Sequence, residues 1–398
     1  MSKQIQEAYI VAATRTPVAK RNGLFRSVRP DDMLAHVLSA VVAKAPGLDP
    51  RDIADVIVGC AMPEAEQGMN VARIGLLLAG LPDTVPGITI NRFCSSGLQA
   101  VADAAARIRL GEAEVMIAAG TESMSVMPQM MGNKVSINPA IFAKEENVGI
   151  AFGMGLTAEK VAQQWKVGRE EQDAFAVQSN QRAVAAIAAG AFRDEITPYV
   201  VRTHVPGEGG TVRVIERTVD TDEGPRADAS MESLGRLKPV FAARGSVTAG
   251  NSSQMSDGAG AVLLMSEAAL KRYNLTPIAR FCSYSVAGVP PQIMGIGPVE
   301  AIPRALAAAG IGQDALDWIE LNEAFAAQAI AVMKQLGLDP AKVNPQGGAI
   351  ALGHPLGATG AIRAATLMSA FQRTSARYGM ISMCIGTGMG AAGIFERV

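Results

Sequence analysis

Cys94 is the residue best placed by the sequence to act as a nucleophile. It stands in the segment NRFCSSG (91–97), between a predicted strand and a predicted helix. A helix N-terminus presents unpaired N–H groups and about half a positive charge, which favours a thiolate. Such positions can lower the pKa of a cysteine from about 8.5 to roughly 3.5–7.5. The plainer interpretation is a buried structural cysteine, because free cysteines are commonly buried.

His354 is the histidine that the sequence favours as a general base. It lies in GGAIALGHPLGATG (347–360), where the glycines permit close backbone approach and positive φ. A histidine held on such a turn could take a proton from a nucleophile. Taken alone, the segment is equally consistent with a structural turn. The other two histidines, His36 and His204, fall in a predicted helix and a polar strand and are interpreted as structural or surface residues.

Two further polar segments could complete a reactive site. Cys384 is followed by glycines 386, 388 and 390, whose N–H groups could bind an oxyanion or a phosphate. A phosphate loop would need a lysine after its glycines, and none follows, so nucleotide hydrolysis is disfavoured. Asn322 and Glu323 stand at a predicted strand-to-helix junction, where an asparagine is also an ordinary N-cap.

Alternating strands and helices must position these segments, which predicts a layered α/β protein. Residues 122–246 are more irregular and indicate an insertion that covers something, or else an ordinary surface subdomain. The two ends share a plan of strand, turn, small-residue helix and strand, which favours a duplicated α/β domain with helices between two sheets. Strands are predicted at 8–13, 55–59, 88–91, 115–119, 259–265, 278–286, 318–321 and 380–383, and helices at 30–45, 70–79, 98–108, 169–189, from 323, and 358–371.

Composition restricts the class of protein. The 398 residues suggest two or three domains, and 49% apolar against 18% charged residues suggest a large core. A net charge of −1 gives no support to nucleic-acid or anionic-membrane binding. Four cysteines without a CxxC pair disfavour a zinc ribbon or a disulfide scaffold. No apolar run suggests a signal peptide or a membrane span, so we expect a soluble protein in a reducing, cytoplasmic compartment.

Four motifs in one order resemble those of the thiolases. They are NRFCSSGLQ (91–99), NEAF (322–325), GGAIALGHP (347–355) and CIGTGMG (384–390). The resemblance covers essentially the whole chain and is strongest to the 3-ketoacyl-CoA thiolases. It implies a five-layered α/β/α/β/α fold made of two duplicated halves, with a loop domain inserted in the first half. The implied domains are 1–121 with 247–270, the inserted 122–246, and 271–398.

The resemblance also implies a role for each reactive residue. Cys94 is similar to the acyl-accepting nucleophile, and His354 to the base that takes its proton and later activates coenzyme A. Cys384 is similar to the acid/base that protonates the departing enolate. Asn322 matches a residue that holds a water for one oxyanion hole, and the N–H groups of Cys94 and Gly386 match the second hole.

Four more residues match positions that bind coenzyme A in the family. Ser253 matches a residue that contacts pantetheine, and Met154 and Phe325 match residues that line the pantetheine tunnel. Arg226 matches a position near the adenine end of coenzyme A. The resemblance implies no metal and no tightly bound cofactor, with coenzyme A as co-substrate.

The activity that the resemblance implies is cleavage of 3-ketoacyl-CoA by coenzyme A, as in β-oxidation. Phe93, Ser95, Gln99 and Thr387 favour this degradative type over an acetoacetyl-CoA or 3-oxoadipyl-CoA thiolase. A carrier-protein condensing enzyme would need a second histidine in the second half, and only His354 lies there. An inactive acyl-CoA- or lipid-binding relative is disfavoured by the intact reactive residues. The implied assembly is a homodimer or homotetramer, and a hydratase/dehydrogenase partner stays open.

Overall fold

The strands form one mixed sheet that has two halves. In the computed structural model, which describes residues 5–127 and 136–398, ten strands are joined in the order β10-β11-β12-β9-β1-β8-β5-β3-β4, with β2 paired to β8. The halves meet where β1 pairs with β9. The strands are β1 (Ala8–Arg15), β2 (Ala19–Lys20), β3 (Asp55–Gly59), β4 (Gly87–Ile90), β5 (Val115–Ser123), β8 (Ser256–Ser266), β9 (Ala279–Gly288), β10 (Leu316–Leu321), β11 (Tyr378–Ile385) and β12 (Met389–Arg397).

The two halves follow the same order of elements, which confirms the predicted duplication. The first runs β1-α1-β3-α3-β5-β8 and the second β9-α8-β10-α11-β11-β12. In each half a parallel pair, β3–β5 or β10–β11, is followed by an antiparallel pair, β5–β8 or β11–β12. The helices of this core are α1 (Pro30–Ala43), α2 (Val71–Leu78), α3 (Ser96–Arg109), α7 (Glu267–Tyr273), α8 (Gly297–Ala309), α9 (Ala326–Leu336), α10 (Ala349–Leu352) and α11 (Leu356–Arg373).

Several of these core elements were not predicted from the sequence, and α8 and β12 are the longest of them. Helix α8 contains Pro298 in its first turn and Pro303 within it, and an internal proline lacks the N–H that a helix requires. Strand β12 is rich in glycine and alanine, which carry little strand signal. Both elements form because the surrounding layers bury them.

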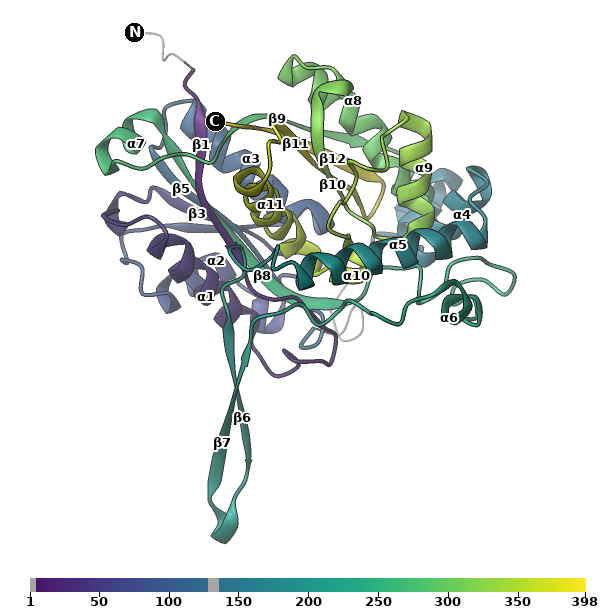
Figure 1. Ribbon diagram of the computed structural model, residues 1–398, viewed down its shortest axis with the longest axis horizontal. Coiled ribbons are helices and arrows are strands. Elements are labelled where there is room, and N and C mark those ends of the chain that lie inside the picture. Colours follow the sequence, from purple (N-terminus) through teal and green to yellow (C-terminus); the bar gives the residue numbers. More distant parts are fainter. Residues whose placement is uncertain (1–4, 128–135) are drawn as a thin grey trace.

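Helices α3 and α11 lie between the two halves of the sheet (Figure 1). One buried cluster joins Leu98 and Leu367 of these helices to Ile10 and Val262 of the first half and to Phe395 of the second. A second cluster packs α1 and α2 on the outer face of the first half, and a third packs α8 and α9 on the outer face of the second. The result is the five-layered α/β/α/β/α arrangement that the sequence predicted.

The two central helices touch backbone to backbone through glycines. A Cβ atom at Gly360 of α11 would lie 2.0 Å from the backbone nitrogen of Leu98, and one at Gly97 of α3 would lie 2.7 Å from that of Ala361. Gly357 is equally confined, because its Cβ would lie 2.6 Å from the Ala61 nitrogen. Only residues without a side chain allow this approach.

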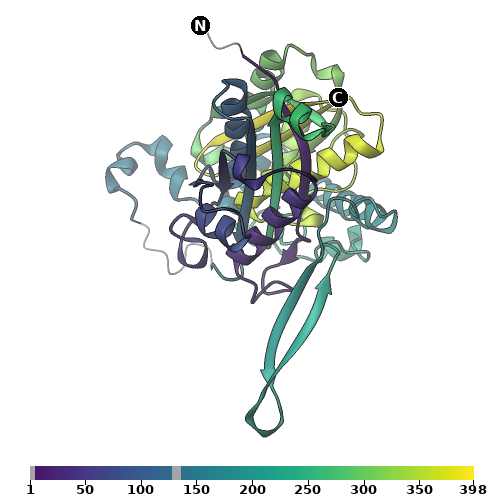
Figure 2. The same cartoon turned by 90° about the vertical axis from the view of Figure 1, so that its left-hand side faces the viewer.

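The connection from β5 to β8 is long, whereas its counterpart in the second half, from β11 to β12, is only the turn 386–388. The predicted insertion, 122–246, falls almost entirely within this connection. It holds α4 (Met154–Gln164), α5 (Arg169–Ala188), α6 (Met231–Gly235) and a hairpin of β6 (Tyr199–Pro206) and β7 (Val212–Val219). The hairpin projects from the body as an arm (Figures 1 and 2). In the described part of the chain, no helix has the length and apolar character to cross a membrane.

A buried ion pair fastens the inserted segment to the core. The guanidinium of Arg15 on β1 donates to Glu195 at 2.6 Å and to both carboxylate oxygens of Asp222 at 2.7 and 2.9 Å. Thr366 of α11 also donates to Glu195 at 2.9 Å. Because all four residues are buried, removing Arg15 would leave two buried carboxylates without their positive partner.

We predict that Gly360→Ala destabilises the protein by about 3 kcal/mol, at the upper end of overpacking costs, because backbone rather than a flexible side chain blocks the new methyl group. This loss exceeds the helix propensity of alanine over glycine, about 1 kcal/mol. Chemical denaturation would measure it. The matched control is Gly235→Ala in α6, where an added Cβ meets nothing within 4 Å. Equal stability of the two variants would contradict the prediction.

Candidate active site

Cys94 lies on a strained turn at the start of α3. It sits in a single 3-10 turn between β4 and α3, and the residue before it, Phe93, has a φ of 44°. Side chains hold this turn: Asn91 Oδ1 accepts from the Phe93 N–H at 2.8 Å, and Ser96 Oγ accepts from the Arg92 N–H at 2.8 Å. A positive φ in a non-glycine residue costs energy, and such strain gathers at functional sites.

The surroundings of Cys94 work against the thiolate that a helix start favours. Burial raises the pKa of Cys94 to about 11, and the charge of Glu122 acts in the same direction. The backbone N–H groups of Gly386 and of Cys94 itself point at the sulfur and oppose this rise only in part. The start of a helix is therefore not enough to ionise this thiol, because removal from water outweighs the helix dipole.

His354 is a neutral base with a defined tautomer. It is buried just before α11, and burial, followed by the nearby Arg363, lowers its pKa to about 3. Its Nε2 lies 3.3 Å from Asn322 Nδ2, which is a donor, and its Nδ1 lies 2.7 Å from Thr359 Oγ1. The consistent assignment places the proton on Nδ1 and leaves the lone pair on Nε2.

Asn322 joins the His354 turn to the end of β10. Its Oδ1 is buried and has no hydrogen-bond partner among the described residues, so the amide can accept one more donor. The neighbouring Glu323 is also buried and accepts from Ser179 Oγ at 2.7 Å, from Asn344 Nδ2 at 2.9 Å and from the Ile350 N–H at 3.2 Å. Glu323 therefore ties the NEAF segment to α5 and to the segment that carries His354.

Cys384 lies at the end of β11, one turn from Gly386. It is buried in an apolar cluster with Val247, Met294 and Phe325. Burial, and then the nearby Cys94, raise the pKa of Cys384 well above its usual range. Cys384 is therefore a neutral thiol near the first one, and it becomes a thiolate only when a strong base takes its proton.

The predicted coenzyme A residues Ser253, Phe325 and Met154 lie around these thiols. The Ser253 N–H donates to the carbonyl of Ala324 at 3.0 Å, which places Ser253 beside Phe325. The Met154 sulfur would lie 3.6 Å from a Cβ built at Gly386. The structure thus brings residues of the insertion and of both halves to one place.

Arg226 lies away from the thiols, beside a small cavity of about 120 Å³. The cavity is also lined by Asn180, Ala249 and Ile350, and the Arg226 backbone N–H donates to Asn180 Oδ1 at 2.9 Å. Its side chain is exposed. The cavity is also lined by Gln254, the neighbour of Ser253 in the chain. Arg226 therefore lies on the same cavity as the residue next to Ser253.

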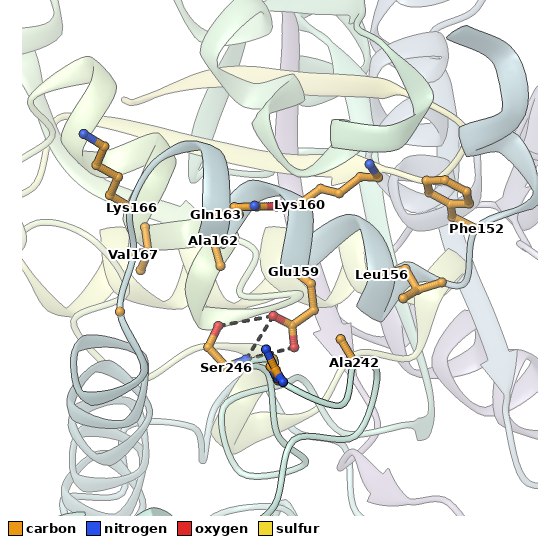
Figure 3. A pocket seen from close by; sticks show the side chains of 13 residues that line it. Phe152, Leu156, Glu159, Lys160, Ala162, Gln163, Lys166, Val167, Ala242 and Ser246 are labelled. Carbon is orange, nitrogen blue, oxygen red and sulfur yellow. Dashed lines mark hydrogen bonds between the residues drawn. The ribbon is translucent and has the colours of Figure 1, made fainter. Parts of the chain in front are cut away.

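A large cavity of the described structure is lined by residues outside the four motifs. It measures about 660 Å³ and lies between α4 and the loop 242–246 (Figure 3). Leu156, Lys160, Lys166 and Arg244 are among its lining residues, whereas none of the predicted catalytic residues lines it. Its carboxylate, Glu159, accepts from the backbone N–H groups of Ser246 and Val247 and is therefore a structural anchor of the loop.

Sequence reasoning missed four residues around the site. Thr359, which orients His354, lay inside a quoted motif but looked like an ordinary helix residue. Phe241 packs edge-to-face on Phe325 at 6.2 Å, and Met294 joins the apolar cluster of Cys384. Glu122 is buried behind the Cys94 turn. The last three are far from the motifs in sequence, so only folding reveals them.

The chain matches known proteins along nearly all of its length. Residues 8–268 match the thiolase N-terminal domain and residues 275–397 the thiolase C-terminal domain. The chain is 50% identical over 393 residues to a 3-ketoacyl-CoA thiolase of Bacillus subtilis strain 168, covering 98% of this chain and 100% of that protein. The crystal structure of Bacillus anthracis acetyl-CoA acetyltransferase superposes with a TM-score of 0.90 at 39% identity, covering 100% of both chains. That of human mitochondrial 3-ketoacyl-CoA thiolase gives 0.87 at 38% identity, covering 99% of both. The chain belongs to the thiolase family.

We predict that alkylation of Cys94 by iodoacetamide accelerates by about tenfold per pH unit between about pH 6 and pH 10, because the thiolate is the nucleophile and its fraction rises tenfold per unit below the pKa. Mass spectrometry of the peptide that contains Cys94 would follow the label, with Cys94→Ser as the blank. A rate that levels off near neutral pH would show an ionised resting thiol and contradict the raised pKa.

Proposed function

We propose that the protein is a 3-ketoacyl-CoA thiolase, an acetyl-CoA C-acyltransferase that cleaves 3-ketoacyl-CoA with coenzyme A into acetyl-CoA and a shortened acyl-CoA. The observation that carries the proposal is that the thiols of Cys94 and Cys384 lie near each other and that α11, which follows His354, packs against the 3-10 turn of Cys94. His354 is neutral, and its Nε2 bears the lone pair. The 50% identity to a 3-ketoacyl-CoA thiolase supports it.

In the first half-reaction, Cys94 gives its proton to His354 Nε2 and its sulfur adds to C3 of the substrate. The bond between C2 and C3 then breaks, and its electron pair forms the enolate of acetyl-CoA. Cys384 donates its proton to C2 and releases acetyl-CoA, which leaves an acyl group on Cys94. A raised thiol pKa makes Cys384 suitable for this step, because the proton stays on sulfur until a strong base, the enolate, forms nearby.

In the second half-reaction, coenzyme A attacks the acyl group on Cys94. For this step the proton that His354 took from Cys94 first passes to the Cys384 thiolate, so that both groups are neutral again. His354 then removes the proton of the coenzyme A thiol, and the tetrahedral intermediate collapses to acyl-CoA and the Cys94 thiolate, which takes that proton back from His354. The N–H groups of Cys94 and Gly386, which already point at the Cys94 sulfur, are suited to stabilise the oxyanion. The burial of His354 supports its use as a base, because it keeps the imidazole neutral.

Coenzyme A would reach the thiols along a path that passes Arg226, then Ser253 and then Phe325. Its pantetheine arm would pass Ser253, Phe325 and Met154, and its adenine end would lie near the exposed Arg226. The apolar side chains of Phe241 and Met294 beside this path suit the uncharged part of the substrate. All four cysteines are free thiols, which supports a reducing compartment, where thiols are kept reduced.

We predict that Cys94→Ser lowers thiolysis to background, because a serine hydroxyl ionises far less readily than a thiol, while its thermal unfolding stays close to that of the wild type. The assay is coenzyme A-dependent cleavage across a chain-length series of 3-ketoacyl-CoA. Fast cleavage of long chains identifies a β-oxidation enzyme, and turnover of acetoacetyl-CoA alone identifies a short-chain one. Normal activity of Cys94→Ser would disprove the assigned nucleophile.

We also infer a homodimer in which β4 pairs with a second copy of itself. Strand β4 is the edge of the sheet, and an uncovered edge is a template for strand pairing. Large apolar side chains surround this edge: Ile88 on β4 is 48% exposed, Leu78 on the adjacent α2 is 56% exposed, and Met69 is 93% exposed. A patch of this kind marks an interaction site.

We predict that Ile88→Asp converts the dimer to a monomer, because it places a charge at the centre of the apolar edge, where desolvating it is costly. Size-exclusion chromatography with light scattering would measure the mass. Val212→Asp, at an exposed position near the tip of the β6–β7 hairpin, is the control and should leave the mass unchanged. A dimer that survives Ile88→Asp would exclude this interface.

A further inference from the structure

A buried carboxylate lies behind the two turns that carry the reactive residues. Glu122, near the end of β5, is 1% exposed. One oxygen accepts from the Ala61 N–H at 2.7 Å and from the Gly357 N–H at 3.0 Å, and the other accepts from the Met62 N–H at 3.3 Å and from the side-chain amide of Gln67. These four groups are all N–H donors, so the ionised carboxylate fits the site.

One side of this carboxylate leads to the nucleophile turn. Glu122 holds the backbone of Ala61, whose carbonyl accepts from Asn91 Nδ2 at 3.0 Å. The oxygen of the same Asn91 amide accepts from the Phe93 N–H at 2.8 Å. The strained φ of Phe93, and with it the direction of Cys94, is therefore tied through Asn91 and Ala61 to Glu122.

The other side leads to the base. Gly357 belongs to the first turn of α11, which also carries Thr359, the partner of His354 Nδ1. A Cβ at Gly357 would lie 2.6 Å from the Ala61 nitrogen and 2.8 Å from the Glu122 oxygen. The absence of a side chain there lets Glu122 hold both Ala61 and Gly357 with a single oxygen.

We propose that Glu122 is a positioning residue of the thiolase reaction, whose carboxylate fixes the Cys94 turn and the His354 turn in the relative placement that acyl transfer requires. The proposal rests on the proposed function, since it assigns Glu122 a task in that reaction. Glu122 acts through Ala61, Asn91 and Gly357 and does not contact the substrate. Its charge also lies close enough to Cys94 to favour the protonated thiol at rest.

The test is Glu122→Gln. The amide keeps the volume, but its NH2 group faces N–H donors and cannot accept from them. We expect kcat to fall at least about tenfold, as when one preorganised contact of a reaction site is lost, with KM for coenzyme A unchanged. Alkylation of Cys94 by iodoacetamide should instead become faster, because a negative charge near the thiol has been removed. Because looser packing would also expose Cys94 to water and speed its alkylation, the alkylation rate is read together with that of a variant that keeps the charge.

Two further variants separate the effect of the Glu122 charge from the effect of its hydrogen bonds. Glu122→Asp keeps the charge but shortens the side chain, so it should restore slow alkylation without restoring full turnover. Asn91→Ala breaks only the link between Ala61 and Phe93, so it should lower kcat without speeding alkylation. Asn91→Ala also tests the role of Glu122 if Glu122→Gln does not fold, because unchanged turnover in Asn91→Ala would overturn the proposal.

The matched control is Glu396→Gln. Glu396 is a buried carboxylate on β12 that accepts from Arg280 and Arg377, away from both thiols. Its variant should lose stability but keep kcat and the alkylation rate. The proposal is overturned if folded Glu122→Gln keeps its kcat, or if kcat and alkylation fall together with the folded fraction. Mass spectrometry of the wild type with substrate comes first: no acyl group on Cys94 would disprove the proposed function, and this inference with it.

Discussion

The site depends on the close approach of α3 and α11. Their glycines, Gly97, Gly357 and Gly360, meet opposing backbone at distances that no Cβ atom tolerates. Because Cys94 precedes α3 and His354 precedes α11, this contact brings the proposed nucleophile and the proposed base to one end of the central layer. The two halves of the sheet then enclose the helices, and the site is buried by the same packing that builds the fold.

Burial also sets the charge state of the site. It lowers the pKa of His354 and raises the pKa of both thiols. Each thiol therefore keeps its proton until the reaction starts, and His354 is free to accept one. Burial also means that the backbone N–H groups of these turns need hydrogen-bond partners within the protein, because water cannot reach them. The buried carboxylates Glu122 and Glu323 meet that need, each binding several N–H or amide donors around the reactive turns.

The inserted segment is part of the site as well as its cover. Ser179 of α5 donates to Glu323, and the Met154 sulfur lies near Gly386. The buried pair of Arg15 with Glu195 and Asp222 holds the segment on β1, and Thr366 links Glu195 to α11. Loss of Arg15 would therefore disturb the central layer and the proposed coenzyme A path together.

The sequence by itself determined the layered fold and the duplication, and it predicted the reactive residues. The motifs and the alternation of strands and helices depend on residues that are close in sequence, so they can be recognised from the sequence alone. The proline-containing α8 and the glycine-rich β12 escaped prediction because packing, not local preference, makes them regular. Tertiary structure alone decided three things: the protonated state of Cys94, the tautomer of His354, and the place of Glu122 between their turns. Each depends on groups distant in sequence and on exclusion of water, and neither of these can be read from neighbouring residues.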